Sequence, residues 1–219
     1  MRGRCRGLRG FQVRGLKLIP RPTTGRGAFL ELVVIVALAI GLALLIQAFL
    51  VKPYQIPSPS MEPTLDVGQR VLVNRVLYHF RDPQIGDIVV FHPPVGAENG
   101  QECGVHQTGT EACPQPTPGE SNTNFIKRIV AGPGDQLSIH DGHPVVNGIQ
   151  ANEDFIRPCG GGNGCNLPHQ ITIPPDHYFM MGDNRGSSDD SRFWGPVPRD
   201  WIIGEAFLTY WPPDRVGIL

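Results

Sequence analysis

Two serines lie one residue apart in the stretch "QIPSPSMEPTL" at 55–65, and each follows a proline. Pro59 restricts Ser58 to an extended conformation and fixes its own backbone angle, whereas Ser60 keeps its backbone N–H. A serine nucleophile needs a base to take its proton, and the oxyanion that forms needs fixed hydrogen-bond donors. The Ser60 N–H and the Ser58 hydroxyl could be those donors. Serine beside proline is, however, also typical of a turn or a helix cap.

A base for such a serine is offered by the segment "FIKRIVA" at 125–131. The chain has 16 arginines but three lysines, and Lys127 is the one lysine within the body of 52–219. Read as a strand, this segment puts Lys127 and Arg128 on opposite faces, and the periodicity does not say which face is buried. Burial can depress the pKa of a lysine, whereas arginine stays charged, so a general base in this pair must be Lys127. The alternative is a surface lysine on an edge strand.

Histidine offers a different base for a serine hydrolase. None of the seven histidines stands in a recognisable catalytic motif, and most fall in expected loops; they are His79, His92, His106, His140, His143, His169 and His177. A Ser/His/Asp hydrolase therefore remains a rival interpretation. Another alternative is a membrane-tethered, non-enzymatic β domain that binds cell-envelope partners.

The elements that would position these residues are short β-type runs separated by turn signals. They lie at 70–78, 87–91, 124–131, 136–140, 178–182 and 205–211. This pattern, without a long amphipathic helix, predicts a mainly β domain that is sandwich-like or barrel-like. Residues 92–123 form a long polar loop, and residues 141–176 are expected to be a smaller inserted β subdomain.

The N-terminal part has a charge pattern of its own. Residues 1–27 carry eight Lys or Arg and no acid, whereas 28–219 carry 11 basic and 20 acidic residues. The apolar run at 32–51 would rise about 30 Å as a helix, which matches the hydrocarbon core of a bilayer. We expect a basic cytoplasmic arm at 1–27, a single transmembrane anchor at 28–51 and an extracytoplasmic domain at 52–219. A cleavable signal peptide and a buried core helix are the alternatives, and the anchor favours a bilayer over nucleic acid as partner.

The cysteines agree with that topology. Cys5 stands alone in the basic arm, and the other four are two close pairs, Cys103 with Cys113 and Cys159 with Cys165. Two local disulfides are the natural interpretation in an oxidising compartment. A metal site that uses Cys103, His106 and Cys113 fits no strong zinc pattern, so we expect no metal and no cofactor.

Four ordered blocks behind the N-terminal anchor carry a family resemblance: "PSPSMEPTL" (57–65), "GDIVVF" (86–91), "FIKRIVAGPGD" (125–135) and "GDNRGSSDDSRFWGPVP" (182–198). In these blocks the chain resembles type I bacterial signal peptidases (leader peptidases), which are membrane-bound serine endopeptidases with a Ser/Lys dyad. The resemblance implies a signal-peptidase-like β catalytic domain that removes N-terminal signal peptides from exported preproteins, after small residues of the Ala-x-Ala type. It also implies the bacterial cytoplasmic membrane as location. Signal peptides and the lipid bilayer are the implied partners, with the secretion translocon as a further candidate.

Roles follow from the resemblance by position. Ser60 would be the nucleophile, Ser58 and Ser60 would form the oxyanion hole, and Lys127 would be the general base. Ser188 would orient that lysine.

The last block supplies the remaining expectations. Asp190 and Arg192 would form a structural ion pair behind the site, with Asp189 as the competitor of Asp190. Residues 182–184 would form the tight turn that delivers the block. Phe193 and Trp194 are candidate membrane contacts.

Overall fold

The computed structural model describes residues 25–98, 103–162 and 164–219. The chain forms two compact units, 1–44 and 45–219, and the second is called the β unit below. The basic arm predicted at 1–27 lies outside the described residues up to residue 24, and Cys5 lies there too.

The first unit holds most of a long apolar helix, α1, which spans Gly25–Phe49. Within it the 20 residues Gly27–Ile46 have a mean hydropathy of 3.0, and the helix is long and apolar enough to cross a membrane. The anchor predicted at 28–51 is wrong at its C-terminal end. Val51 already belongs to a strand, because it pairs with Asn74 of the neighbouring strand.

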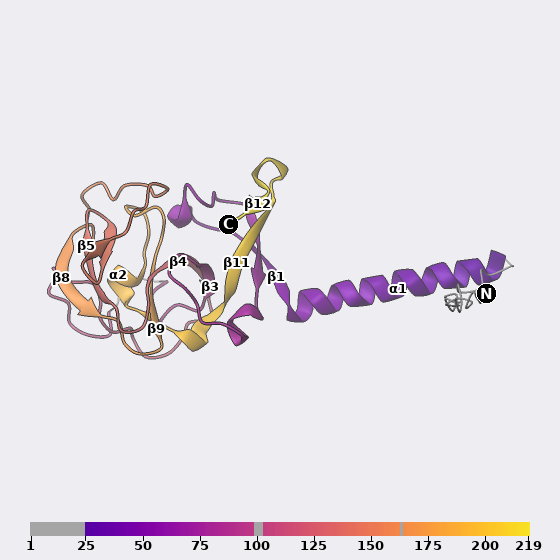
Figure 1. The fold of residues 1–219 in the computed structure, drawn as a ribbon, viewed down its shortest axis with the longest axis horizontal. Coiled ribbons are helices and arrows are strands. Elements are labelled where there is room, and N and C mark those ends of the chain that lie inside the picture. The colour runs from indigo at the N-terminus through magenta and orange to yellow at the C-terminus, as the bar shows by residue number, and fades with distance from the viewer. Residues whose placement is uncertain (1–24, 99–102, 163) are drawn as a thin grey trace, which may run out of the picture. The chain divides into compact units, whose positions relative to one another are not determined.

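The β unit is mainly β, as Figure 1 shows. Its strands are β1 Val51–Gln55, β2 Arg70–Asn74, β3 Ile88–Phe91, β4 Phe125–Ala131, β5 Gln136–His140, β6 His143–Val146, β7 Ile149–Gln150, β8 Leu167–Thr172, β9 His177–Met181, β10 Val197–Pro198, β11 Ile202–Trp211 and β12 Gly217–Ile218. Its short helical segments are η1 Pro59–Met61, η2 Leu77–His79, α2 Ser191–Trp194, η3 Arg199–Trp201 and η4 Pro213–Arg215.

Two antiparallel sheets organise these strands. The larger has the order β1-β2-β11-β3-β4-β9-β10, with β12 paired to β11, and the smaller has the order β7-β6-β5-β8. Figure 1 shows β5 and β8 of the smaller sheet on the side of the β unit away from β1 and β12. The smaller sheet overlaps the subdomain predicted at 141–176, but it begins earlier, with β5 at Gln136.

Most predicted strands are present with shifted ends. The strand predicted at 70–78 is the clearest error, because β2 stops at Asn74 and Leu77–His79 forms a helical turn. The Asn74 side-chain oxygen accepts hydrogen bonds from the backbone N–H groups of Val76 and Leu77, at 3.0 and 3.1 Å. This local bonding replaces the ladder that a longer strand would need.

One hydrophobic cluster brings together segments that are distant in the sequence. Met61, which follows Ser60, is 0% exposed and packs in the same buried cluster as Ile126, which precedes Lys127. Strands β2, β3 and β11 contribute further members to this cluster, among them Val73, Val90 and Ala206. Apolar burial of the residue next to each candidate therefore fixes where the two polar side chains meet.

Candidate active site

The Ser60 loop is a short helical turn whose geometry follows from its prolines. Ser58 precedes the turn with φ −136° and ψ 158°, the extended conformation that Pro59 imposes on the residue before it. Pro59 is the first residue of η1, where its missing N–H costs no hydrogen bond. The Ser58 hydroxyl makes no helix-cap bond and lies 3.2 Å from the Ser60 Oγ.

Ser60 and Lys127 lie in direct contact. The Lys127 Nζ donates a hydrogen bond to the Ser60 Oγ at 2.7 Å, and the two side chains are 67 residues apart in the sequence. Ser60 is 6% exposed and Lys127 4% exposed. The edge-strand alternative for Lys127 is wrong, because β4 lies between β3 and β9 inside the larger sheet.

Burial tunes this lysine for proton transfer. Loss of solvation lowers the pKa of Lys127 from 10.5 to about 8, against the opposing charges of Asp190 and Asp189. A lysine with this pKa is partly neutral near physiological pH, and only the neutral amine can accept a proton from serine. The contact thus pairs a nucleophile with a usable base.

Residues 182–184 hold both halves of the pair. Asn184 donates from its backbone N–H to the Ser60 carbonyl at 3.0 Å and from its side-chain amide to the Pro59 carbonyl at 3.1 Å. Asp183 is fully buried and forms a two-bond ion pair with Arg128, the neighbour of Lys127, at 2.7 and 2.9 Å. The segment is therefore a clamp between the serine loop and β4, which goes beyond the tight turn expected for it.

Gly182 lets this clamp come close. Its backbone approaches so tightly that a Cβ would collide with the Ser188 Oγ and the Ser60 carbonyl oxygen. Its N–H donates to the Asp190 carboxylate at 3.0 Å. A residue with a side chain would therefore push the Ser60 loop away from the clamp.

The structure pairs Arg192 with Asp190 and leaves Asp189 apart. The Arg192 Nε lies 2.8 Å from the Asp190 carboxylate, with both side chains buried. Burial alone would raise the pKa of Asp190, but the Arg192 guanidinium holds that pKa below its usual value. Arg192 also donates to the backbone carbonyls of Arg185 and Ser188, at 2.8 and 3.3 Å, so the pair braces the turn that carries Ser188.

Ser188 is close to the site but does not bond to the lysine. Its Oγ is buried without a hydrogen-bond partner among the residues that the structure describes, and so is one carboxylate oxygen of the neighbouring Asp189. Burial and the charge of Asp190 raise the pKa of Asp189 to about 6. Sequence reasoning weighed Asp189 only as a competitor for Arg192 and missed its place beside the lysine.

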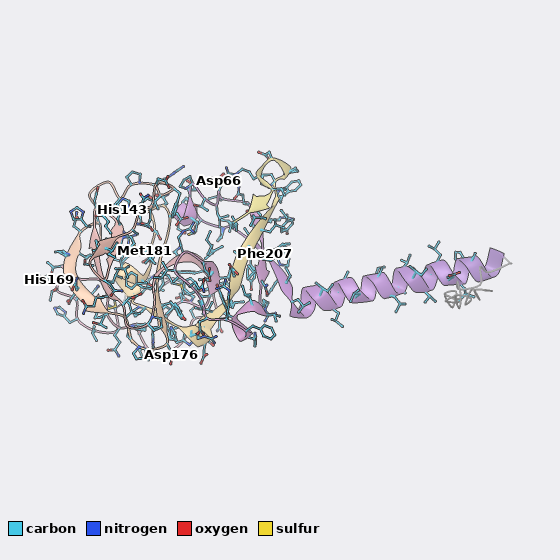
Figure 2. All side chains as sticks on the ribbon, viewed as in Figure 1. Asp66, His143, His169, Asp176, Met181 and Phe207 are labelled. Atoms are coloured by element: carbon cyan, nitrogen blue, oxygen red, sulfur yellow. A yellow bond between two sulfur atoms is a disulfide. The ribbon has the colours of Figure 1, made fainter. Side chains whose placement is uncertain are left out.

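A cavity of about 490 Å³ opens over the Ser60–Lys127 contact. Its lining is largely apolar and comes from the end of β1, the Ser60 loop, β3, β4 and the 182–192 block: Tyr54, Gln55, Ile56, Pro57, Ser58, Ser60, Val90, Asn124, Phe125, Ile126, Lys127, Ser187 and Asp189. None of the seven histidines lines it. Figure 2 labels two of them, and both belong to the smaller sheet, His143 on β6 and His169 on β8.

Two further expectations concern the cysteines, as disulfides and as metal ligands. Disulfides join Cys103 to Cys113 and Cys159 to Cys165, each with a Cα–Cα distance of 5.6 Å. Among the described residues, no group of three or more His, Cys, Asp or Glu is placed to hold a metal ion.

The aromatic pair does not form an exposed surface. Trp194 is wrong as a membrane contact, because it is 0% exposed and packs 5.9 Å from the Phe91 ring. Phe193 is half-buried, with its ring 5.4 Å from the Arg192 guanidinium. Both rings therefore serve packing around α2.

Comparison with known proteins identifies the family. The protein-family model described as "Signal peptidase, peptidase S26" matches residues 29–211 of this chain. The chain belongs to this family. It is 39% identical over 185 residues to signal peptidase I of Leptolyngbya laminosa, which covers 84% of this chain and 80% of that protein. It is 36% identical over 194 residues to the probable signal peptidase I-2 of a Synechocystis species, and this match covers 87% of this chain and 77% of that protein.

A more distant relative agrees. Signal peptidase I of Pseudomonas aeruginosa is 32% identical over 227 residues, which cover 81% of this chain and 72% of that protein. Membership makes this chain a serine endopeptidase that removes signal peptides from preproteins and associates with a membrane.

Proposed function

We propose that Ser60 and Lys127 perform the peptide-bond cleavage. Neutral Lys127 takes the proton of the Ser60 hydroxyl as its Oγ attacks the carbonyl at the cleavage site of an exported preprotein. The single observation that carries this assignment is the 2.7 Å contact between the Lys127 Nζ and the Ser60 Oγ, with both side chains buried. The lowered pKa of Lys127 supports it.

The remaining steps use the same groups. The Ser60 N–H and the Ser58 hydroxyl stabilise the oxyanion of the tetrahedral intermediate, and the 3.2 Å separation of the two serine hydroxyls supports the role of Ser58. Protonated Lys127 gives its proton to the leaving amine, and the acyl-enzyme forms. Lys127 then activates the water that hydrolyses it.

Ser188, Asp190 and Arg192 support this dyad from behind. Asp190 binds both Arg192 and the Gly182 N–H, so it links the ion pair to the clamp that holds Ser60. The Ser188 side chain lies against Gly182, and the tight packing of its Oγ there supports a positioning role. In this mechanism Asp190 does not touch the substrate.

The cavity suits an extended substrate with small side chains. β1 is an edge strand of the larger sheet, and its end lines the cavity together with Asn124–Lys127 of the β4 region. We infer that the signal peptide is bound in an extended form between these two segments by strand addition. The apolar lining supports apolar side chains such as alanine at positions −1 and −3, which agrees with substrates of the Ala-x-Ala type.

We further propose the membrane arrangement. Residues 52–219 form the peptidase domain outside the cytoplasm, 141–176 form its inserted subdomain, and the basic arm stays in the cytoplasm. The two disulfides support an oxidising compartment, and the eight positive charges before the helix support the orientation. Exported preproteins would then reach the cavity as they leave the secretion translocon of a bacterial cytoplasmic membrane.

The test is cleavage of a purified Ala-x-Ala preprotein by the full chain in detergent. Ser60→Ala and Lys127→Ala should each abolish release of the mature protein, by at least about 10³-fold. Ser138→Ala in β5 and Lys52→Ala, a lysine with an exposed side chain, are matched controls that should retain activity. Cleavage that survives in either dyad variant would contradict the assignment.

A further inference from the structure

One carboxylate near the dyad has no role in the mechanism above. Four charged groups act on Lys127 through space, namely Asp190, Asp189, Asp183 and Arg192. Three of them are already committed to ion pairs, because Asp190 binds Arg192 and Asp183 binds Arg128. Among the described residues, no cation lies within ion-pair distance of Asp189.

The place of Asp189 makes this charge relevant to catalysis. Asp189 lines the same cavity as Ser60 and Lys127, and it also lines a second cavity together with Phe193. One of its carboxylate oxygens is buried and accepts no hydrogen bond from any described part of the chain. An unbonded buried carboxylate oxygen is costly unless a positive charge forms nearby.

Such a charge forms during the reaction. When Lys127 takes the Ser60 proton, its amine becomes an ammonium with three N–H donors, and the Ser60 Oγ is its hydrogen-bond partner in this structure. Asp189 Oδ1 and Ser188 Oγ are the two buried oxygen atoms of the neighbouring turn that are free to accept. The ammonium and the carboxylate thus complement each other whenever Lys127 carries a proton, both in the free enzyme below about pH 8 and after Lys127 takes the Ser60 proton.

We propose that Asp189 is a positioning residue of the dyad: its carboxylate on the cavity wall stabilises the ammonium form of Lys127 and sets the pH range in which the enzyme turns over. This inference rests on the proposed Ser60/Lys127 mechanism. The direction of the expected pH shift follows from the negative charge of Asp189. Removing the carboxylate favours the neutral amine, so the acidic limb of kcat/KM, which reports ionisation of the free base, moves to lower pH.

The size of the effect can be estimated. A unit charge within about 10 Å, at an effective dielectric constant of about 20, changes a neighbouring ionisation by roughly one pH unit. Asp189 is half-buried, so partial solvation reduces this to about 0.5–1 unit. We expect Asp189→Asn to move the limb by that amount and to raise activity at pH 6.5–7 about threefold or more, relative to its own alkaline plateau.

The first experiment measures the lysine directly. The chain has three lysines, Lys17, Lys52 and Lys127, so lysine-selective ¹³C labelling gives few signals, and Lys127→Ala assigns the one of interest. In full chains that carry Ser60→Ala, the titration midpoint of Lys127 should fall when Asp189 is changed to Asn. Asp189→Glu should keep the original midpoint, and so should Asp200→Asn, which removes an exposed acid that does not act on Lys127.

The second experiment is the pH profile of preprotein cleavage by the same variants without Ser60→Ala. Asp189→Ser is a second neutral variant in case Asp189→Asn fails to fold. An unchanged midpoint and limb in the neutral variants, with Ser60→Ala and Lys127→Ala inactive, would overturn the role of Asp189 and leave the mechanism standing. Cleavage by Lys127→Ala would overturn the mechanism itself, and the titration would still report whether Asp189 acts on the lysine.

Discussion

Replacement of Gly182 by alanine tests whether the 182–184 clamp positions the nucleophile. The added Cβ would overlap both the Ser188 Oγ and the backbone carbonyl oxygen of Ser60. The backbone of Gly182 is not in the left-handed region, so the effect is steric and not a matter of backbone strain. The Ser188 hydroxyl can rotate away, but the Ser188 Cβ, which the new Cβ also overlaps, and the Ser60 carbonyl move only with their backbones. Asn184 holds the Ser60 loop by two hydrogen bonds.

The magnitude follows from these contacts. Overpacking of a tight site costs about 1–3 kcal/mol of folding free energy, and each kcal/mol lowers the Tm of a domain of this size by about 2–4 °C. A shift of the Ser60 loop by about 1 Å would lower kcat/KM by about 10²-fold. We therefore expect a folded, less stable protein whose activity falls far more than its stability explains.

Gly217→Ala is the matched control, because a Cβ there meets no atom within 4 Å. Thermal melts by circular dichroism and preprotein cleavage should be measured for both variants in detergent. Gly217→Ala should equal the wild type in both. If Gly182→Ala also cleaves at the wild-type rate, the close approach of Gly182 does not position Ser60 and the reasoning is wrong.

Three further outcomes can be checked. In the wild type, kcat/KM should rise with pH through about 8, because burial lowers the pKa of Lys127 to about 8 and only the neutral amine is a base; a flat profile from pH 6 to 9 would contradict this. Lys127→Met should abolish cleavage yet raise the free energy of unfolding at pH 7 by about 1–3 kcal/mol, since it removes a buried ammonium; urea titrations would show it, and the gain should shrink as pH rises from about 8 towards 10.5. Arg128→Met and Asp183→Ala each break the buried ion pair, and each should lower the free energy of unfolding by about 3–5 kcal/mol. The double variant should lose less than the sum of the two single losses, and additive losses would refute the coupling.

Local features of the fold were predictable from the sequence. The run of apolar residues from 32 onward is a helix whatever surrounds it, because its length and composition are sufficient, and β5 was predicted with its observed bounds because alternation and flanking turns are local signals. Element ends were less predictable. Asn74 ends β2 by bonding to the next backbone N–H groups, and Val51 leaves the apolar run for β1 because a partner strand is present.

The candidate site divides in the same way. The types and spacing of Ser58, Ser60 and Lys127 are properties of the sequence, and so is the survival of the Ser60 N–H beside two prolines. Which cation of β4 would face the serine was open, because both faces of a central strand are buried and periodicity then carries no information.

Only the tertiary structure supplied the contacts behind the pairs that the family resemblance implied. It placed Lys127 against Ser60 across 67 residues and Arg192 against Asp190, and among the described residues it left the buried Asp189 Oδ1 on the cavity wall without a hydrogen-bond partner. It also showed that Asp183 and Asn184 clamp β4 to the serine loop, a role for which the sequence had no local signal. The physical reason is that a hydrogen bond or a pKa depends on distance and burial, and both arise when distant segments pack together.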